Sequence, residues 1–348
     1  MIRKFIKDIV EENNGFHYDQ PHRLGEESLS VIVPVIREVN WKRNYITLAE
    51  AKNVIIEDTG RIDLVNVKNN EDMPLYINRG AIFSGGTQER AVIHGHIVKP
   101  NSSLNVAVRC IHQTKGISAS TIMKYDGCVP YTIDLTKQLK TWESINVYTT
   151  NCSGDNLTIN TDITLGNISH NVFTDYSPIN YEVTYASTTG DFTIDCDNNN
   201  MQIPHLTDKS NTYRQDDLVG ALDDMSNKIK DAMKNIPYIE NQVGGVFIEG
   251  TGKITGLDIY DIPKSWQSIK NDIIRKEGAS FIDDDDDLFV MRPEKASKNI
   301  SKKLDAEFIE KVIYSSDYSV IEIRYEELIG EAVVFENRVI HLTLWNKE

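Results

Sequence analysis

Cysteine is scarce in this chain, which has four cysteines among 348 residues. They lie far apart, at Cys110, Cys128, Cys152 and Cys196, and no two of them form a C-x-x-C pair. This spacing excludes a zinc knuckle and a redox dithiol of the usual kind. Buried free thiols are the expectation, and Cys110, which ends an alternating strand pattern, has a typical core position. Cys152 and Cys196 bracket an extended segment and can pair in an oxidising compartment.

Positive charge is also scarce, because 37 Lys and Arg residues are outnumbered by 52 Asp and Glu residues and the formal net charge is −15. Non-specific binding of nucleic acid requires a surplus of Lys and Arg on some face, so we expect no nucleic-acid partner. No uninterrupted apolar segment approaches membrane-spanning length, and the apolar run at the N-terminus is too short for a signal peptide. The sequence therefore predicts a cytoplasmic protein without a membrane partner.

Several catalytic signatures are missing. The sequence has neither a Gly-x-Ser-x-Gly elbow nor a His-Glu-x-x-His helix, so serine hydrolase and zincin mechanisms have no support. The Gly-Thr-Gly-Lys run at 250–253 lacks the spacer of a phosphate-binding loop and is expected to be a hairpin turn. The acidic run Asp283 to Asp287 lacks the alternate ligands and the glycine of an EF-hand, so a solvated loop is the expectation.

Hydrolysis by carboxylates alone stays open. Asp258 and Asp261 lie near the end of a predicted strand, and Glu249 or Glu331 can approach them in the folded chain. No cofactor is predicted from the sequence.

What the chain does have is the composition of a globular protein, with 40% hydrophobic and 26% charged residues. Alternating apolar patterns dominate its first third and recur, together with helical patterns, in its last third. We therefore predict an α+β fold, an antiparallel β-sandwich-like core with packed helices and a β-rich insertion. The expected parts are an N-terminal β-rich part of the core at 1–143, a polar insertion at 144–206 and a C-terminal α+β part at 207–348.

The same patterns predict individual elements. Helices are expected at 2–12, in a short segment after Thr47 that has a capping box with Glu50, and at 215–235, 264–276 and 304–315. Strands are expected at 29–36, 54–57, 62–66, 75–78, 91–98, 103–109 and 318–325. Exposed hairpins are expected around 156–165 and 181–185, and further hairpins at 244–260 and at 331–345, the last with its turn at 336–337.

The most informative motif is a glycine-rich elbow within residues 73–110. Gly85 and Gly86 lie between two extended stretches and are followed closely by Gln88 and Arg90. Such an elbow can bring backbone N–H groups and an arginine fork to one point, which suits an anionic or planar polar ligand. We predict that these four residues bind the ligand, with Arg90 facing phosphate or carboxylate. The alternative is a structural bridge that ties the elbow to a neighbouring strand.

Histidines near the elbow suggest a second kind of chemistry. His94 and His96 lie two residues apart and share one face of the predicted strand. With His112 or a carboxylate as a third ligand, they are candidate metal ligands. The alternative is that they are solvated or hydrogen-bonded neighbours. His341, in the closing strand, is expected to be a satisfied core or rim histidine.

Several short stretches together resemble a known prokaryotic family. They are 46–51, the elbow at 80–90, the turn at 100–103 before 106–111, the strand 241–248 with 256–260, and 330–334 with 338–342. In this order they resemble the domain called ARG and rhodanese-phosphatase superfamily-associated protein. The resemblance spans both ends of the chain and omits most of 144–206. The family is named for its association with ADP-ribosylglycohydrolases and rhodanese-like phosphatases, so the resemblance implies a role near ADP-ribose or nucleotide metabolism.

Three functions follow as alternatives. The first is a recognition module for an ADP-ribose-like or other phosphorylated small ligand. The second is a metal-assisted hydrolase that acts on such a ligand through His94, His96 and acidic partners. The third is a homo-oligomeric structural protein assembled through residues 144–206. Ala81 stands where relatives in this family tend to carry a glutamate, and the loss of that carboxylate favours recognition over hydrolysis.

Overall fold

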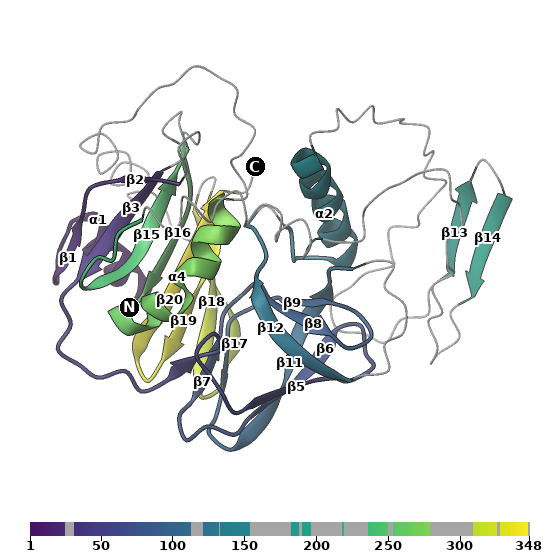
Figure 1. The fold of residues 1–348 in the computed structure, drawn as a ribbon, viewed down its shortest axis with the longest axis horizontal. Coiled ribbons are helices and arrows are strands. Elements are labelled where there is room, and N and C mark those ends of the chain that lie inside the picture. Colours follow the sequence, from purple (N-terminus) through teal and green to yellow (C-terminus); the bar gives the residue numbers. More distant parts are fainter. Residues whose placement is uncertain are drawn as a thin grey trace. The chain divides into compact units, whose positions relative to one another are not determined.

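The computed structural model describes residues 1–24, 31–112, 121–131, 133–153, 182–187, 190–195, 218, 236–249, 253–278, 309–325 and 328–346. The chain divides into two compact units, Met1–Cys152 with Gln215–Glu348, and Ser153–Arg214. The described strands of the second unit, β13 (Glu182–Ser187) and β14 (Gly190–Asp195), pair as an antiparallel hairpin (Figure 1). The domain boundaries predicted at 143 and 206 stay predictions.

The first unit contains an antiparallel sheet of nine strands, which are β1 (Phe16–Tyr18), β2 (His22–Arg23), β3 (Val31–Arg37), β15 (Gln242–Ile248), β16 (Ile254–Tyr260), β17 (Ile309–Ser315), β18 (Tyr318–Tyr325), β19 (Leu328–Phe335) and β20 (Arg338–Asn346). Their order is β1-β3-β15-β16-β20-β19-β18-β17, and β2 also pairs with β3. Because β3 pairs with β15, the two ends of the chain share this sheet. Glu336 and Asn337 have φ values of 47° and 60°, which the tight turn between β19 and β20 requires.

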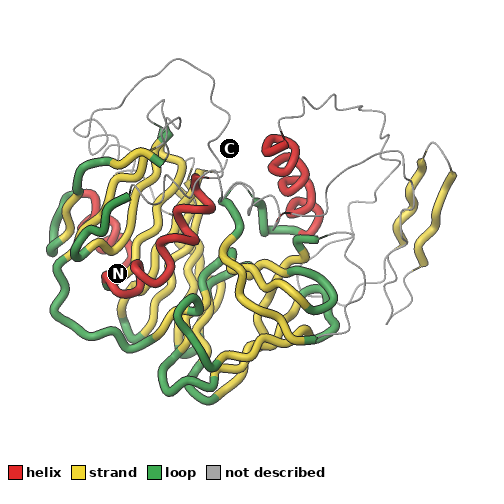
Figure 2. Tube along the Cα trace, in the orientation of Figure 1, coloured by secondary structure: helices red, strands yellow, loops and turns green. Residues whose placement is uncertain are grey.

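Six further strands close into a barrel, namely β5 (Val54–Asp58), β6 (Leu64–Asn69), β8 (Ala81–Gly85), β9 (Arg90–Val92), β11 (Ser102–Cys110) and β12 (Ile122–Cys128). They follow the order β11-β6-β5-β12-β8-β9. Figure 2 draws these strands in yellow, with the described loops that connect them in green. Alternate residues such as Val65, Val67, Val106 and Val108 are fully buried in one apolar cluster, as the two-residue period of a strand requires. A small third sheet consists of β4 (Ile46–Thr47), β7 (Leu75–Ile77) and β10 (His96–Val98).

Three helices are described, α1 (Ile2–Val10), α2 (Gln138–Ser153) and α4 (Pro263–Gly278). Ile2, Phe5, Ile6 and Ile9 of α1 recur at helical spacing and are buried in a cluster with Val246 and Leu257 of the large sheet. Alternate strand residues belong to a second cluster, in which Phe247 and Tyr260 join Trp266, Ile269 and Ile273 of α4 and Tyr45 and Tyr76 from the region of the small sheet. The two clusters therefore lie on opposite faces of the nine-stranded sheet.

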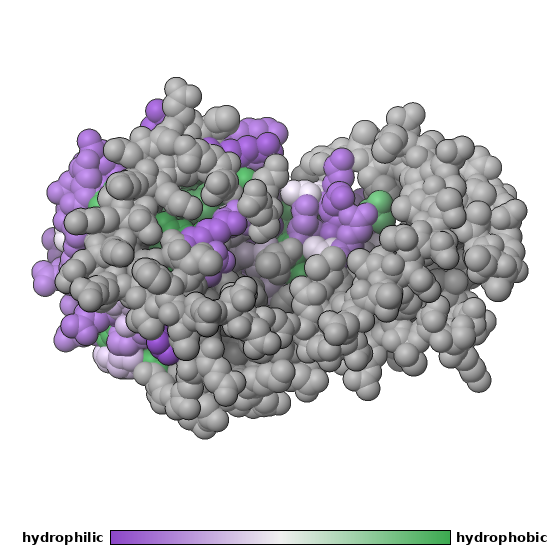
Figure 3. Space-filling model, turned by 90° about the horizontal axis from the view of Figure 1, so that it is seen from above, coloured by the Kyte–Doolittle hydropathy of each residue, from purple (hydrophilic) through white to green (hydrophobic). Residues whose placement is uncertain are grey.

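The described surface is mostly hydrophilic on the face drawn in Figure 3, where hydrophobic residues form small separate patches. Over the described residues, the large hydrophobic side chains that stay exposed are Met1, Ile55, Ile122, Leu139, Tyr238 and Val312. Scattered residues of this kind are normal on a protein surface. None of the described helices combines the length and the apolar character that crossing a membrane requires. Assembly through 144–206 stays a prediction, because most of that segment lies outside the described residues.

Much of the sequence-based prediction is confirmed. The fold is strand-rich with large antiparallel sheets, and the helices at α1 and α4 and the hairpins β15–β16 and β19–β20 occur where the patterns placed them. Cys110 and Cys128 are buried free thiols. The sandwich-like arrangement of the core stays a prediction. The helix predicted at 215–235, the hairpin at 156–165, the turn at 250–252 and the acidic run 283–287 lie outside the described residues, except for Leu218.

Three predictions of local structure are wrong. Ile309–Ser315 is strand β17, because its β-branched and aromatic residues pair with β18 at the edge of the sheet. Thr47 and Glu50 form the hydrogen bond of a capping box, Thr47 N to Glu50 Oε1 at 2.9 Å, but the residues after Thr47 form a turn and not a helix. The strand predicted at 91–98 is interrupted before Gly95, so β9 joins the barrel and β10 joins the small sheet.

Candidate functional site

The glycine-rich elbow connects β8 to β9 in the barrel. Gly85 and Gly86 have φ values of 92° and 65°, which L side chains rarely adopt. A Cβ atom at Gly86 would lie 2.9 Å from Oδ2 of Asp58. That carboxylate accepts hydrogen bonds from Thr87 N at 2.8 Å and Gly60 N at 2.9 Å, and these bonds contribute to lowering the pKa of Asp58 although its burial opposes them. Both glycines are therefore required by the packing of the turn.

The polar side chains of the elbow turn toward their own chain. Arg90 is only 2% exposed, and its Nη1 donates to Oε1 of Gln88 at 2.5 Å. Burial raises the pKa of the neighbouring Cys110 thiol, and the positive charge of Arg90 opposes that rise. This geometry is that of a structural bridge. Ligand binding by Gly85, Gly86, Gln88 and Arg90 stays a prediction, and the stability of an Arg90 variant distinguishes the two roles.

Replacing Arg90 with alanine is expected to lower the free energy of unfolding by about 1.5 kcal/mol, because the change removes a buried guanidinium and leaves the half-buried Gln88 without its charged donor. Urea titration of the variant and the wild type measures this difference. Arg61→Ala is the matched control, since Arg61 is 64% exposed and its ion pair with Asp63 lies on the surface. An unchanged stability in Arg90→Ala would return the elbow to consideration as a ligand site.

The three candidate metal ligands have separate partners. His94 Nδ1 lies 2.9 Å from Oε2 of Glu331, and His96 Nδ1 lies 2.8 Å from the Tyr318 hydroxyl. His112 Nδ1 lies 3.3 Å from a carboxylate oxygen of Glu89. Over the described ranges, no group of three or more His, Cys, Asp or Glu side chains converges as a metal site requires. The structure therefore does not bring His94, His96 and His112 together.

Two of the acidic residues considered in the sequence share a row across the large sheet. Asp258 of β16 and Glu331 of β19 are both paired in register with Thr343 of β20, so they face the same side. Asp258 Oδ1 lies 2.6 Å from Nε2 of His341, while Glu331 accepts from the backbone N–H of Gly95 at 2.6 Å and contacts His94. These carboxylates are buried and serve the contact between the large sheet and the small sheet.

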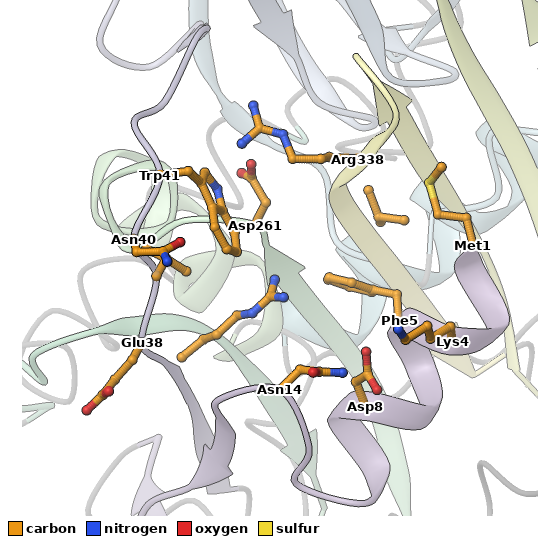
Figure 4. A pocket seen from close by; sticks show the side chains of 13 residues that line it. Met1, Lys4, Phe5, Asp8, Asn14, Glu38, Asn40, Trp41, Asp261 and Arg338 are labelled. Carbon is orange, nitrogen blue, oxygen red and sulfur yellow. The ribbon is translucent and has the colours of Figure 1, made fainter.

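An open groove lies at one end of the nine-stranded sheet and has a volume of about 770 Å³. It forms where β3 and β16 end and β20 begins, and these three ends coincide because β3 and β16 run in the same direction and β20 runs opposite to them. Helix α1 supplies Lys4, Phe5 and Asp8 to one wall (Figure 4). The remaining lining residues are Met1, Asn14, Arg37, Glu38, Val39, Asn40, Trp41, Asp261, Arg338 and Val339.

Arg37, at the end of β3, is held in the groove by aromatic rings. Its guanidinium carbon lies 4.2 Å from the ring centroid of Phe16, 4.9 Å from that of Trp41 and 5.6 Å from that of Phe5. Partial burial lowers the pKa of Arg37, and the charges of Asp261 and Asp8 oppose that effect. Within the described part of the chain, no carboxylate comes within ion-pair distance of this guanidinium, and its buried Nε has no hydrogen-bond partner. Rings that fix an arginine in this way prepare it for an external acceptor.

Arg338 begins β20 and is also partly buried. Its guanidinium carbon lies 5.9 Å from the Trp41 ring centroid, and its Nη2 donates to Asn44 Oδ1 at 3.1 Å. Asp261, which also lines the groove, is 1% exposed. Burial raises the pKa of Asp261, whereas the hydrogen bond from Tyr45, the charges of Arg338 and Arg37 and the indole N–H of Trp41 act in the opposite direction. Cations, an aromatic ring and a carboxylate thus converge on one open space.

The amino-acid sequence of the chain matches one protein family. The family model for the ARG and Rhodanese-Phosphatase-superfamily-associated Protein domain matches residues 15–129 and 198–345. The chain belongs to this family. The match covers β3 and the segment after it as well as β16 and β20, so most of the groove lies within it. No curated protein and no solved structure matches the chain.

The sequence interpretation missed most of this groove. Arg37 and Trp41 follow a predicted buried strand directly, and Arg338 follows a predicted turn, so each has a local signal of exposure at a strand end. Arg37, Trp41 and Arg338 line one groove with Asp261 because of the strand order, since β3 and β20 are both neighbours of the β15–β16 hairpin. A single sequence does not reveal that order.

Proposed function

We propose that the chain is a recognition module for a small phosphorylated ligand of the ADP-ribose-like class, and that the groove at Arg37, Trp41 and Arg338 binds it. The observation that carries the proposal is a pair of arginines that line an open groove without a carboxylate at ion-pair distance in the described part of the chain. Arginine forks match the oxygen geometry of phosphate, and such bonds are charge-assisted. The chain has a formal net charge of −15, so acidic residues are plentiful as ion-pair partners. Two arginines of one groove that lack such a partner among the described residues therefore support a site for an anionic ligand.

The size and the lining of the groove support a small ligand with a planar part. A volume of about 770 Å³ is in the usual range for small-molecule sites. Trp41 offers a ring face for stacking, and Phe5 extends the apolar wall. The family is named for its association with ARG and rhodanese-phosphatase superfamily proteins, which is consistent with a ligand that carries phosphate.

The lining also favours binding over turnover. Among the described residues that form the groove there is no histidine, cysteine, serine or threonine, so hydroxyl and thiol nucleophiles and the usual imidazole base are lacking there. The histidines considered for a metal-assisted hydrolase lie elsewhere, each with its own partner. We therefore propose recognition as the activity of this site.

Replacing Arg338 with glutamine is expected to weaken binding of ADP-ribose about tenfold, because one charge-assisted interaction with phosphate is lost. Isothermal titration calorimetry of the wild type and the variant measures the change. Arg324→Gln is the matched control, since Arg324 is 62% exposed and paired with Glu322 on β18. The proposal fails if wild-type protein binds neither ADP-ribose nor a simpler phosphate monoester, or if Arg338→Gln binds as tightly as the control.

A further inference from the structure

Besides Arg37, two residues of the groove carry buried polar atoms that make no hydrogen bond of normal geometry. They are the Oδ2 atom of Asp261 and the indole Nε1 of Trp41. Buried polar atoms are almost always hydrogen-bonded in folded proteins, so each exception calls for a partner. One of these atoms is an acceptor and the other is a donor. Both belong to residues that line the open groove, where a partner can be supplied by a ligand (Figure 4).

The position of the Asp261 carboxylate is fixed from behind. Its Oδ1 atom accepts from the Tyr45 hydroxyl at 2.6 Å, and that hydroxyl accepts from Ser265 Oγ at 2.9 Å. The backbone N–H of Asp261 donates to the carbonyl of Ile340 at 3.1 Å. Tyr45 is fully buried, so this arrangement is part of the core. The carboxylate is therefore held rigidly, and only Oδ2 is left for another donor.

Trp41 places its indole N–H near the Asp261 carboxylate. The indole N–H lies close enough to Asp261 to help lower the pKa of the carboxyl, although the two atoms do not meet in a hydrogen bond of normal geometry. An acceptor next to a donor is complementary to a group that is donor and acceptor at once, and a hydroxyl is the smallest such group. Its O–H donates to Oδ2, and its oxygen accepts from Nε1.

We infer that Asp261 and Trp41 recognise a hydroxyl group of the bound phosphate compound, so that the groove selects phosphate esters that carry a hydroxyl group, such as sugar phosphates. This inference rests on the proposed function, because Arg37 and Arg338 hold the phosphate while the acceptor and donor pair reads the hydroxyl. A site built around a ligand hydroxyl rejects analogues that lack it, since its buried polar groups then stay unpaired. The selectivity is the property to measure.

Ribose 5-phosphate and methyl phosphate test this selectivity, because both are phosphate monoesters and only the first carries hydroxyl groups. Calorimetric titration of the wild type is expected to show about tenfold tighter binding of ribose 5-phosphate. Asp261→Asn keeps an oxygen for Tyr45 but replaces the free acceptor with an N–H donor. This variant is expected to bind both compounds with similar affinity, while methyl phosphate binds at least as well as to the wild type because a negative charge is removed.

Asp317→Asn is the matched control, since Asp317 is 57% exposed, pairs with Lys99 and does not line the groove, so its variant is expected to keep the tenfold preference. Trp41→Phe keeps a ring against Arg37 and removes only the indole donor, so it is expected to reduce the preference too. If Asp261→Asn does not fold, Trp41→Phe tests the inference in its place. Wild-type protein that binds both compounds equally overturns the inference and leaves the proposed function standing. No binding of either compound overturns the inference, and if ADP-ribose does not bind either, the proposed function is overturned as well.

Discussion

Replacing His341 with leucine is expected to lower the free energy of unfolding by about 3–5 kcal/mol, which is the usual cost of leaving one partner of a buried polar pair uncompensated. His341 is 2% exposed and stacks on Tyr260 with ring centroids 4.3 Å apart. Its two ring nitrogens lie 2.6 Å from the Tyr76 hydroxyl and 2.6 Å from Oδ1 of Asp258. Leucine fills the space of the ring but leaves both neighbours without these bonds.

His341 is the middle of a chain of hydrogen bonds. Burial raises the pKa of Tyr76 well above its ordinary value, so its hydroxyl keeps its proton and bonds with Nδ1 of His341. Nε2–H of the ring donates to Asp258. Because Tyr76 belongs to β7 and the other two residues belong to the large sheet, the chain of bonds joins the small sheet to the large sheet. A loss at His341 therefore affects the contact between two sheets.

Chemical denaturation and a double-mutant cycle check the prediction. The double variant Asp258→Leu with His341→Leu is expected to lose less free energy of unfolding than the two single variants lose together. The reason is that the double variant no longer buries a lone carboxylate. His17→Leu is the control, since His17 is an exposed histidine on β1. A loss below about 1 kcal/mol for His341→Leu would show that the buried bonds contribute little.

The sequence predicts regular elements of this fold wherever local pattern and packing agree. Helix α1 has apolar residues at helical spacing, and the β19–β20 hairpin combines alternating residues with a turn at Glu336 and Asn337. The sequence pattern predicted a helix over 304–315, whereas the β-branched residues of 309–315 at a sheet edge gain more from pairing with β18. Here tertiary pairing overrides the local pattern.

The candidate site was harder to predict than the fold because it depends on strand order. Arg90 follows two glycines in the sequence, a pattern typical of a ligand loop, but the fold buries its guanidinium against Gln88. Arg37, Asp261 and Arg338 have no common motif, and they meet because the ends of three strands coincide. Burial and register are properties of the folded chain. Local spacing alone therefore does not reveal which arginines line a groove.

His96 is expected to make the protein lose stability as the pH falls from about 7.5 to about 5, by about 2 kcal/mol. Its side chain is buried beside the Tyr318 hydroxyl, and burial, with the neighbouring His94, lowers its pKa to about 4 while Glu331 opposes the shift. In the unfolded chain a histidine has a pKa of about 6.5. Between these values the unfolded state binds a proton that the folded state does not bind, so stability falls as the pH falls.

The test compares slopes of stability against pH, because a substitution at His96 can also change stability at every pH. Urea titrations at a series of pH values are expected to show that His96→Gln loses about 2 kcal/mol less than the wild type over this range. Carboxylates such as Glu331, whose pKa is lowered mainly by its bond with His94 although burial opposes this, lose their contribution at lower pH in both proteins. His17→Gln, at an exposed site, is expected to keep the wild-type slope. Parallel curves for His96→Gln and the wild type would mean that His96 takes up its proton in the folded chain nearly as easily as in the unfolded chain.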